Sequence, residues 1–108
     1  MAVRYGSVIL LRDDRRNEYV ALHKNVWPEV LEQIRRSNIV NYSIFLHDGL
    51  LFSYFEYVGD DFAADIAAMA ADEATRRWWE LTDPCQEPVS AAVSGERWAQ
   101  MTEVFHSD

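Results

Sequence analysis

Two runs of β-forming residues flank a short turn signal, and this pairing limits the fold more than any other feature of the chain. The runs cover residues 38–46 and 50–58, and both are rich in β-branched and aromatic side chains. Asp48-Gly49, which lies between them, is a turn signal of the kind that joins antiparallel strands. The sequence therefore predicts a β-hairpin near the middle of the chain.

Two further strands are predicted, one at each end. Residues 3–11 form an apolar, β-branched run that predicts a first strand. Residues 97–106 predict a last strand, although their spacing would also allow a helix. Residues 82–97 contain two prolines and a glycine, so we expect a long loop before the last strand.

Helices are predicted on the N-terminal side of the hairpin. Asp13-Asp14 can cap a helix that runs to about Asn25. Pro28 suits the first turn of a new helical segment, which we expect to end at Arg36.

Two more helices are predicted after the hairpin. Asp60-Asp61 can cap an alanine-rich helix, and Asp72 can cap a short helix that carries Trp78 and Trp79. The resulting order, β-α-β-β-α-β, matches a ferredoxin-like α+β sandwich. We expect a single domain spanning residues 1–108, because the chain is large enough for one core but not for two.

Both faces of the predicted sheet are partly apolar. Alternation along the second strand places Val40, Tyr42, Ile44 and Leu46 on one face and Phe45 on the other. The helices can cover only one of these faces, so something else must cover the second. A second copy of the chain is the simplest cover, and we therefore expect a homodimer of the dimeric α+β barrel type.

Charge and composition exclude several classes of partner. The net charge of −8 argues against nucleic acid and against a polyanionic substrate, because both need a basic face. The chain shows no signal-peptide pattern and no apolar run of membrane length, so we expect a soluble, cytoplasmic protein without membrane contact. The single cysteine, Cys85, cannot form an intrachain disulfide, and we interpret it as an incidental thiol in a loop.

The segment from Tyr19 to Glu29 predicts a site for proton transfer. Tyr19, His23 and Trp27 are spaced four residues apart, which places them on one stripe of a helix. Imidazole is the side chain best suited to proton transfer near neutral pH, and flanking aromatic rings suit a sugar-sized ligand. A lone histidine on an apolar stripe is, however, more often a structural residue, and both readings stay open on this feature alone.

The other aromatic and histidine residues give weaker signals. Adjacent helix residues point about 100° apart, so one of Trp78 and Trp79 must pack while the other lines a cavity or an interface. We expect His47 to be solvated and His106 to lie in a frayed terminus. The histidine spacing does not match a metal site, and the sequence has no glycine-rich phosphate loop, so no metal or cofactor is expected.

Taken together, these motifs resemble the L-rhamnose mutarotase family over nearly the whole chain. The residues that carry the resemblance are Tyr19, His23, Trp27-Pro28-Glu29, Asn41-Tyr42-Ser43-Ile44, Trp78-Trp79 and Glu103-Val104-Phe105-His106. The resemblance implies a ferredoxin-like dimer that interconverts the α and β pyranose anomers of L-rhamnose without a cofactor. It implies that His23 is the catalytic acid and that Tyr19, Tyr42, Trp78 and Trp79 contact the sugar.

Other functions remain open. Residues 82–101 differ from the best-known rhamnose members, and L-fucose, another 6-deoxy sugar, is an alternative substrate. A cofactor-free or haem-handling oxygenase of the dimeric α+β barrel type is a second alternative, because fold does not fix function. A non-catalytic sugar-binding dimer, in which His23 only donates a hydrogen bond, is a third.

Overall fold

The computed structural model describes residues 2–90 and 95–108. Within these residues the strands are β1 (Val3–Leu11), β2 (Ile39–His47), β3 (Leu50–Tyr57), β4 (Gln86–Glu87) and β5 (Ala99–Met101). The helices are α1 (Arg16–Leu22), α2 (Pro28–Arg36), α3 (Phe62–Ala71) and α4 (Glu73–Thr82), with short 3-10 turns η1 (Asp13–Arg15) and η2 (Asp83–Cys85). None of these helices is both long and apolar enough to cross a bilayer.

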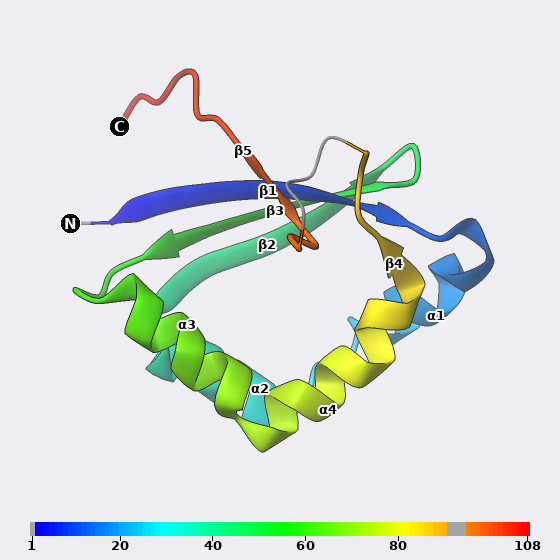
Figure 1. Ribbon diagram of the computed structural model, residues 1–108, viewed down its shortest axis with the longest axis horizontal. Helices are drawn as coiled ribbons and strands as arrows, with labels where there is room; N and C mark the ends of the chain where they lie inside the picture. Colours follow the sequence, from blue (N-terminus) through cyan, green and yellow to red (C-terminus); the bar gives the residue numbers. More distant parts are fainter. Residues whose placement is uncertain (1, 91–94) are drawn as a thin grey trace.

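The strands form one antiparallel sheet in the order β2-β3-β1-β4, and β5 also pairs with β1 (Figure 1). The long β1–β3 pairing runs from Val3 opposite Tyr57 to Leu10 opposite Leu50. The two short C-terminal strands follow each other along the opposite edge of β1. This is the strand order of a ferredoxin-like sheet, so the predicted α+β class is confirmed.

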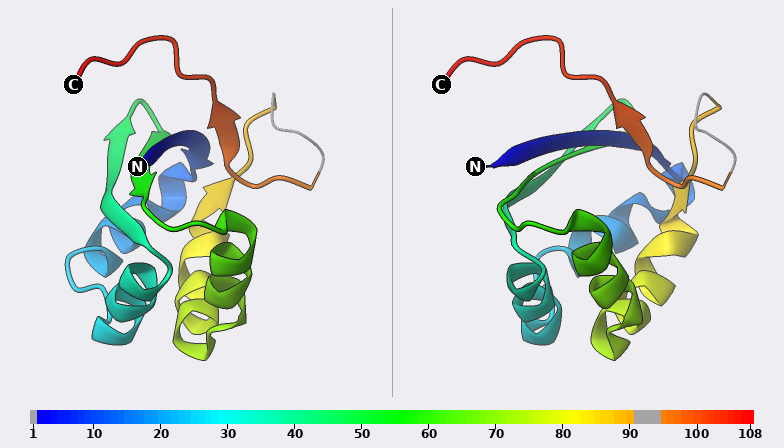
Figure 2. Two further views of the ribbon diagram at one scale, coloured as in Figure 1. Left: turned by 90° about the vertical axis from the view of Figure 1, so that its left-hand side faces the viewer. Right: turned by 60° about the vertical axis from the view of Figure 1, so that its left-hand side comes forward.

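All four helices lie on one side of the curled sheet (Figure 2). Among the residues that the structure describes, no helix lies on the other side, which we call the open face of the sheet, and the chain after β5 extends on that side (Figure 1). Phe45 is 63% exposed and Met101 is 41% exposed. The prediction that the helices cover only one of two partly apolar faces is therefore confirmed.

The central hairpin has the predicted turn. Asp48 and Gly49 both adopt positive φ angles, 50° and 75°. Two consecutive positive φ angles are typical of the type I′ turn, whose twist matches that of the flanking strands. The carbonyl of Gly49 also accepts a hydrogen bond from the backbone N–H of Leu11 at 2.8 Å, which ties the turn to the end of β1.

Three of the predicted helix starts are confirmed. Pro28 is the first residue of α2, which ends at Arg36 as expected. Asp61 caps α3 by accepting a hydrogen bond from the backbone N–H of Ala64 at 3.1 Å. Asp72 caps α4 in the same way through Thr75, whose N–H and hydroxyl both donate to one carboxylate oxygen.

The predicted cap of the first helix is wrong. Asp13 and Asp14 lie inside the turn η1, and neither side chain caps α1, which begins at Arg16 and ends at Leu22 rather than near Asn25. Asp14 instead forms an ion pair with Arg12 at 3.1 Å. The chain tightens into a 3-10 turn directly after β1, and this delays the start of the helix.

A β-bulge in β2 overturns the predicted face of one residue. Val40 is paired with Glu56, but Ser43 is paired with Tyr54, so β2 contains one extra residue between these pairs. Asn41, inside this interval, has a φ of 51°. A bulge reverses the alternation of side chains. Val40 therefore lies on the open face of the sheet, not beside Tyr42 as predicted.

The C-terminal third departs most from expectation. The last strand covers only Ala99–Met101, whereas residues 102–108 form no regular element. The predicted loop contains η2 and β4, and residues 91–94 of it lie outside the described residues.

Cys85 is a core residue and not an incidental loop thiol. It is fully buried in a cluster with Ile9, Leu11, Tyr19 and Leu51. Its thiol points toward the carbonyl oxygen of Leu81 at 3.6 Å, and burial raises the pKa of Cys85 above its usual value.

Candidate active site

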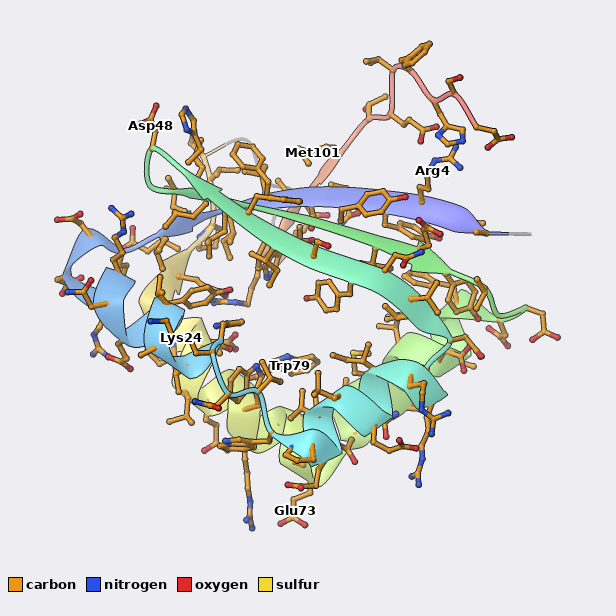
Figure 3. All side chains as sticks on the ribbon, turned by 180° about the vertical axis from the view of Figure 1, so that it is seen from behind. Arg4, Lys24, Asp48, Glu73, Trp79 and Met101 are labelled. Carbon is orange, nitrogen blue, oxygen red and sulfur yellow. The ribbon has the colours of Figure 1, made fainter. Side chains whose placement is uncertain are left out.

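A cavity of about 450 Å³ lies between the sheet and the helices α1, α2 and α4. Its volume falls in the range of roughly 300–1,000 Å³ that is typical of small-molecule pockets. Aliphatic and aromatic side chains dominate its wall. The lining residues are Tyr19, Val20, His23, Lys24, Val26, Val30, Leu31, Ile34, Tyr42, Ile44, Leu46, Leu51 and Trp78. Figure 3 shows side chains that point into the space between the sheet and the helices, and it labels Lys24, which follows α1.

His23 is held at the end of α1 by two hydrogen bonds to one carbonyl oxygen. Its backbone N–H and its ring Nδ1 lie 3.2 Å and 2.9 Å from the carbonyl oxygen of Tyr19. A carbonyl oxygen only accepts hydrogen bonds, so Nδ1 must carry the proton. The second ring nitrogen, Nε2, is therefore the one available to a ligand, as an acceptor in the neutral ring and as a donor in the protonated ring.

Aromatic rings surround the imidazole. The ring of Tyr19 stacks on His23 with a centroid distance of 4.2 Å. The ring of Trp78 meets His23 edge-on at 5.3 Å, and Trp27 meets Trp78 in the same way at 5.3 Å. The predicted contact between Tyr19 and His23 is confirmed.

The single helical stripe predicted for this segment is wrong. Helix α1 ends at Leu22, and α2 begins only at Pro28. His23 is the C-cap of α1, and Trp27 is the N-cap of α2. Trp27 joins the aromatic group through Trp78 of α4, so the cluster is built by tertiary packing and not by spacing along one helix.

The two tyrosines of the cavity carry neutral hydroxyl groups. Tyr19 is 4% exposed, and burial raises its pKa well above the usual value of a phenol. Tyr42 comes from β2, and the pKa of its hydroxyl is also raised by desolvation, although 43% of the whole residue is exposed. Both hydroxyls therefore stay protonated at neutral pH and can donate hydrogen bonds.

The two adjacent tryptophans of α4 have different environments. Trp78 is 6% exposed and lines the cavity, whereas Trp79 is 36% exposed and is not among the lining residues. The two side chains do point in different directions, as expected of adjacent helix residues, but Trp78 is both the packed residue and the one that lines the cavity. The predicted sugar contact of Trp79 stays a prediction.

The other two histidines lie away from the cavity wall. The Nε2 of His47 is 3.1 Å from Asp48 in the exposed hairpin, and the Nε2 of His106 is 2.8 Å from Asp108 in the exposed C-terminal segment. His47 is solvated, as expected.

The sequence patterns did not point to Lys24 or Gln86, which the structure places at the cavity and beside Tyr19. Lys24 lines the cavity from the segment between α1 and α2, and its position beside His23 was the only available signal. Gln86 donates a hydrogen bond from Nε2 to the hydroxyl of Tyr19 at 3.3 Å. Gln86 lies in a segment predicted to be a loop, far from Tyr19 in sequence, and no local pattern pointed to it.

The arrangement suits proton transfer on a small, largely neutral ligand. It combines one imidazole nitrogen, two neutral phenol hydroxyls, the side chain of Lys24 and walls that are otherwise largely apolar. Apolar and aromatic surfaces bind the C–H faces of a ligand, and a few polar groups fix its orientation.

Comparisons with known proteins point to a family of sugar-converting enzymes. A family model described as L-rhamnose mutarotase matches residues 4–107. An L-rhamnose mutarotase from Oceanobacillus iheyensis is 30% identical over 109 residues, which cover 97% of this chain and 98% of the relative. An L-rhamnose mutarotase from Lactiplantibacillus plantarum is 32% identical over 108 residues, which cover 98% of this chain and 99% of the relative.

The fold is also that of a solved relative. The crystal structure of an L-rhamnose mutarotase from Formosa agariphila matches with a TM-score of 0.76 and 21% identity, covering 98% of this chain and 99% of that one. At this identity the likeness concerns the fold alone. The family model and the two relatives, by contrast, match in sequence over almost the full length, and this chain belongs to the L-rhamnose mutarotase family.

Proposed function

We propose that the protein interconverts the α and β pyranose anomers of L-rhamnose, with His23 as the group that transfers protons. The observation that carries this proposal is the hydrogen bond from His23 Nδ1 to the carbonyl of Tyr19. It fixes the tautomer and leaves Nε2 as the one proton-transfer atom that the imidazole offers to the cavity. Membership of the family supports L-rhamnose as the substrate.

The reaction requires only proton transfer and rotation. A proton is added to the ring oxygen of the pyranose while another is removed from the anomeric hydroxyl. The bond between C1 and the ring oxygen then breaks, and C1 becomes an aldehyde. Rotation about C1–C2 followed by the reverse steps gives the other anomer with no net change in protons or electrons. General acid–base catalysis typically accelerates a reaction by about 10²–10⁴-fold. This is enough for mutarotation, which already proceeds in water without a catalyst.

The cavity wall supplies binding. We assign the stacking surface to Trp78, which lies against His23 at 5.3 Å. The hydroxyls of Tyr19 and Tyr42 are the polar groups that would orient the sugar. A 6-deoxy sugar has an apolar methyl group and one hydroxyl fewer than an ordinary hexose, which suits a wall made largely of aliphatic side chains.

We also propose that the protein is a homodimer formed through the open face of the sheet. Phe45 is 63% exposed on that face, and its cross-strand partner Phe52 lies beside it. Exposed apolar surface of this kind is typical of an interface between subunits.

The proposed activity can be measured by NMR exchange between the α and β anomeric protons of L-rhamnose. The wild-type protein should accelerate this exchange, and His23→Asn should not. Asparagine can still donate to the carbonyl of Tyr19, but it has no atom in place of Nε2. His47→Asn is the matched control, because the side chain of His47 is 78% exposed at the hairpin, and it should keep full activity.

Two results would contradict the proposal. Absence of acceleration by the wild-type protein would remove the catalytic function and leave a sugar-binding protein at most. Acceleration of the exchange of L-fucose but not of L-rhamnose would show that the proposed substrate is wrong and that the proposed reaction is right.

A further inference from the structure

The hydroxyl of Tyr19 accepts a hydrogen bond from Gln86, a residue that does not line the cavity and that the proposed mechanism does not use. Gln86 lies in β4, where it pairs with Leu11 of β1, and it is 7% exposed. Its Nε2 donates to the hydroxyl oxygen of Tyr19 at 3.3 Å. Both the NH₂ group and the oxygen of a buried amide need hydrogen-bond partners. The partner of the Gln86 oxygen therefore shows how the amide is oriented.

Arg97 fixes which end of the amide faces Tyr19. One guanidinium nitrogen of Arg97 lies 3.4 Å from Oε1 of Gln86 and 3.0 Å from the carbonyl oxygen of Asp83. The Nε of Arg97 lies 3.7 Å from the carboxylate of Asp83. A guanidinium has donors and no acceptor, so Gln86 must present its oxygen to Arg97 and its NH₂ group to Tyr19.

This orientation determines what the Tyr19 hydroxyl can do. Its oxygen already accepts a hydrogen bond from Gln86, so its own proton must be donated elsewhere. Among residues 2–90 and 95–108, Gln86 is the one hydrogen-bond partner found for this hydroxyl. Tyr19 lines the cavity and stacks on His23 at 4.2 Å, so an oxygen of a ligand in the cavity can accept this proton.

We propose that Gln86, oriented by Arg97, is a positioning residue that commits the hydroxyl of Tyr19 to donate a hydrogen bond to the sugar. The inference rests on the proposed function and adds a residue to it. The acceptor is a sugar oxygen in the cavity that Tyr19 and His23 line together.

Two substitutions of Gln86 separate this role from a structural one. In Gln86→Glu the carboxylate can only accept, so the Tyr19 proton turns toward it and away from the sugar. We expect a loss of roughly 10- to 100-fold in kcat/KM, the cost of one misdirected buried hydrogen bond. Gln86→Met removes the donor without supplying an acceptor, so the hydroxyl can still rotate toward the sugar and the loss should be smaller.

A purely structural role predicts the opposite order. Glutamate can form an ion pair with Arg97 and keep the fold intact, whereas methionine leaves the guanidinium without this partner. A larger loss of activity in Gln86→Met than in Gln86→Glu would therefore overturn the inference. Gln100→Glu makes the same chemical change at an exposed position of β5 and serves as the control for the added negative charge.

A double-mutant cycle with Tyr19→Phe completes the test. Without a hydroxyl there is nothing for Gln86 to orient, so Gln86→Glu should cost less than twofold in kcat/KM in that background. Losses that simply multiply would show that Gln86 acts independently of Tyr19. Affinity for L-rhamnose, measured by tryptophan fluorescence, should follow the same pattern.

The controls also separate this inference from the proposed function. A wild-type protein that neither binds L-rhamnose nor accelerates its exchange would overturn the proposed function and this inference with it. An active wild-type protein whose Gln86→Glu variant equals it in both measurements would overturn this inference alone.

Discussion

The ring Nδ1 of His23 lies 2.9 Å from the carbonyl oxygen of Tyr19, so the backbone of α1 determines which imidazole nitrogen is protonated. The neutral ring of His23 should therefore be the Nδ1–H tautomer. Two-dimensional ¹H–¹⁵N correlation of the imidazole nitrogens checks this directly, with the exposed His47 as a reference in the same spectrum. A neutral His23 protonated at Nε2 would contradict the assignment of Nε2 as the proton acceptor.

Trp78 and Trp79 should respond very differently to substitution. Trp78→Ala should lower the free energy of unfolding by about 3–5 kcal/mol, the usual cost of removing a large buried aromatic side chain. Trp79→Ala should cost clearly less, because 36% of Trp79 is exposed. Urea unfolding followed by circular dichroism gives both values.

The same pair tests sugar contact. Trp78→Phe should raise KM for L-rhamnose by about 2- to 10-fold, the size of an aromatic contact. Trp79→Phe is the matched variant, and a similar rise in KM there would show that Trp79 also contacts the sugar. Anomer-exchange kinetics at several sugar concentrations distinguish these outcomes.

Stability at high pH should depend on Tyr57. Its hydroxyl donates to Asp65 and accepts from the backbone N–H of Asp61, and burial together with the neighbouring carboxylate raises the pKa of Tyr57 to about 12. The unfolded chain has a tyrosine pKa of about 10. Between these values the folded state binds more protons at Tyr57 than the unfolded state. The contribution of Tyr57 to stability is therefore constant below pH ~10 and falls as the pH rises toward ~12.

The Tyr57→Phe variant checks this sign. It should be less stable than the wild type at neutral pH, because it loses the hydrogen bonds to Asp65 and Asp61. Its further loss of stability between pH ~10 and ~12 should be smaller. Thermal melts across this pH range measure both, and an equally steep alkaline loss in the variant would contradict the role of Tyr57.

The open sheet face should control the oligomeric state. Phe45→Lys places a charge at a position that is 63% exposed on that face and should convert the proposed dimer into a monomer. Leu81→Lys, at a 40% exposed position on α4, adds the same charge on the helical side and should leave the mass unchanged. Light scattering at micromolar concentration gives the masses, and a monomeric wild-type protein would refute the dimer.

Local chemistry allowed much of the fold to be predicted. The Asp48-Gly49 turn, the start of α2 at Pro28 and the caps at Asp61 and Asp72 each depend on one residue and its immediate neighbours. Such signals act over a few residues, and tertiary packing does not override them here.

Features that depend on distant partners could not be predicted. The bulge at Asn41 becomes visible only in the pairing of β2 with β3, and it moved Val40 to the other face. The aromatic cluster was predicted from spacing along one helix, but Trp78 holds it together from α4. The contact of Gln86 with Tyr19 joins residues 67 positions apart, so no local pattern could reveal it.

Tyr19 and Leu51 belong both to the buried core cluster and to the wall of the cavity. Any substitution there that reshapes the space for a ligand also changes core volume, and a buried Leu→Ala change typically costs about 2–5 kcal/mol. Val20 and Leu31 line the same cavity but are 41% and 53% exposed. Substitutions at these two positions can therefore change which sugar is preferred with little loss of folding stability. A directed-evolution library for new substrates should begin with them.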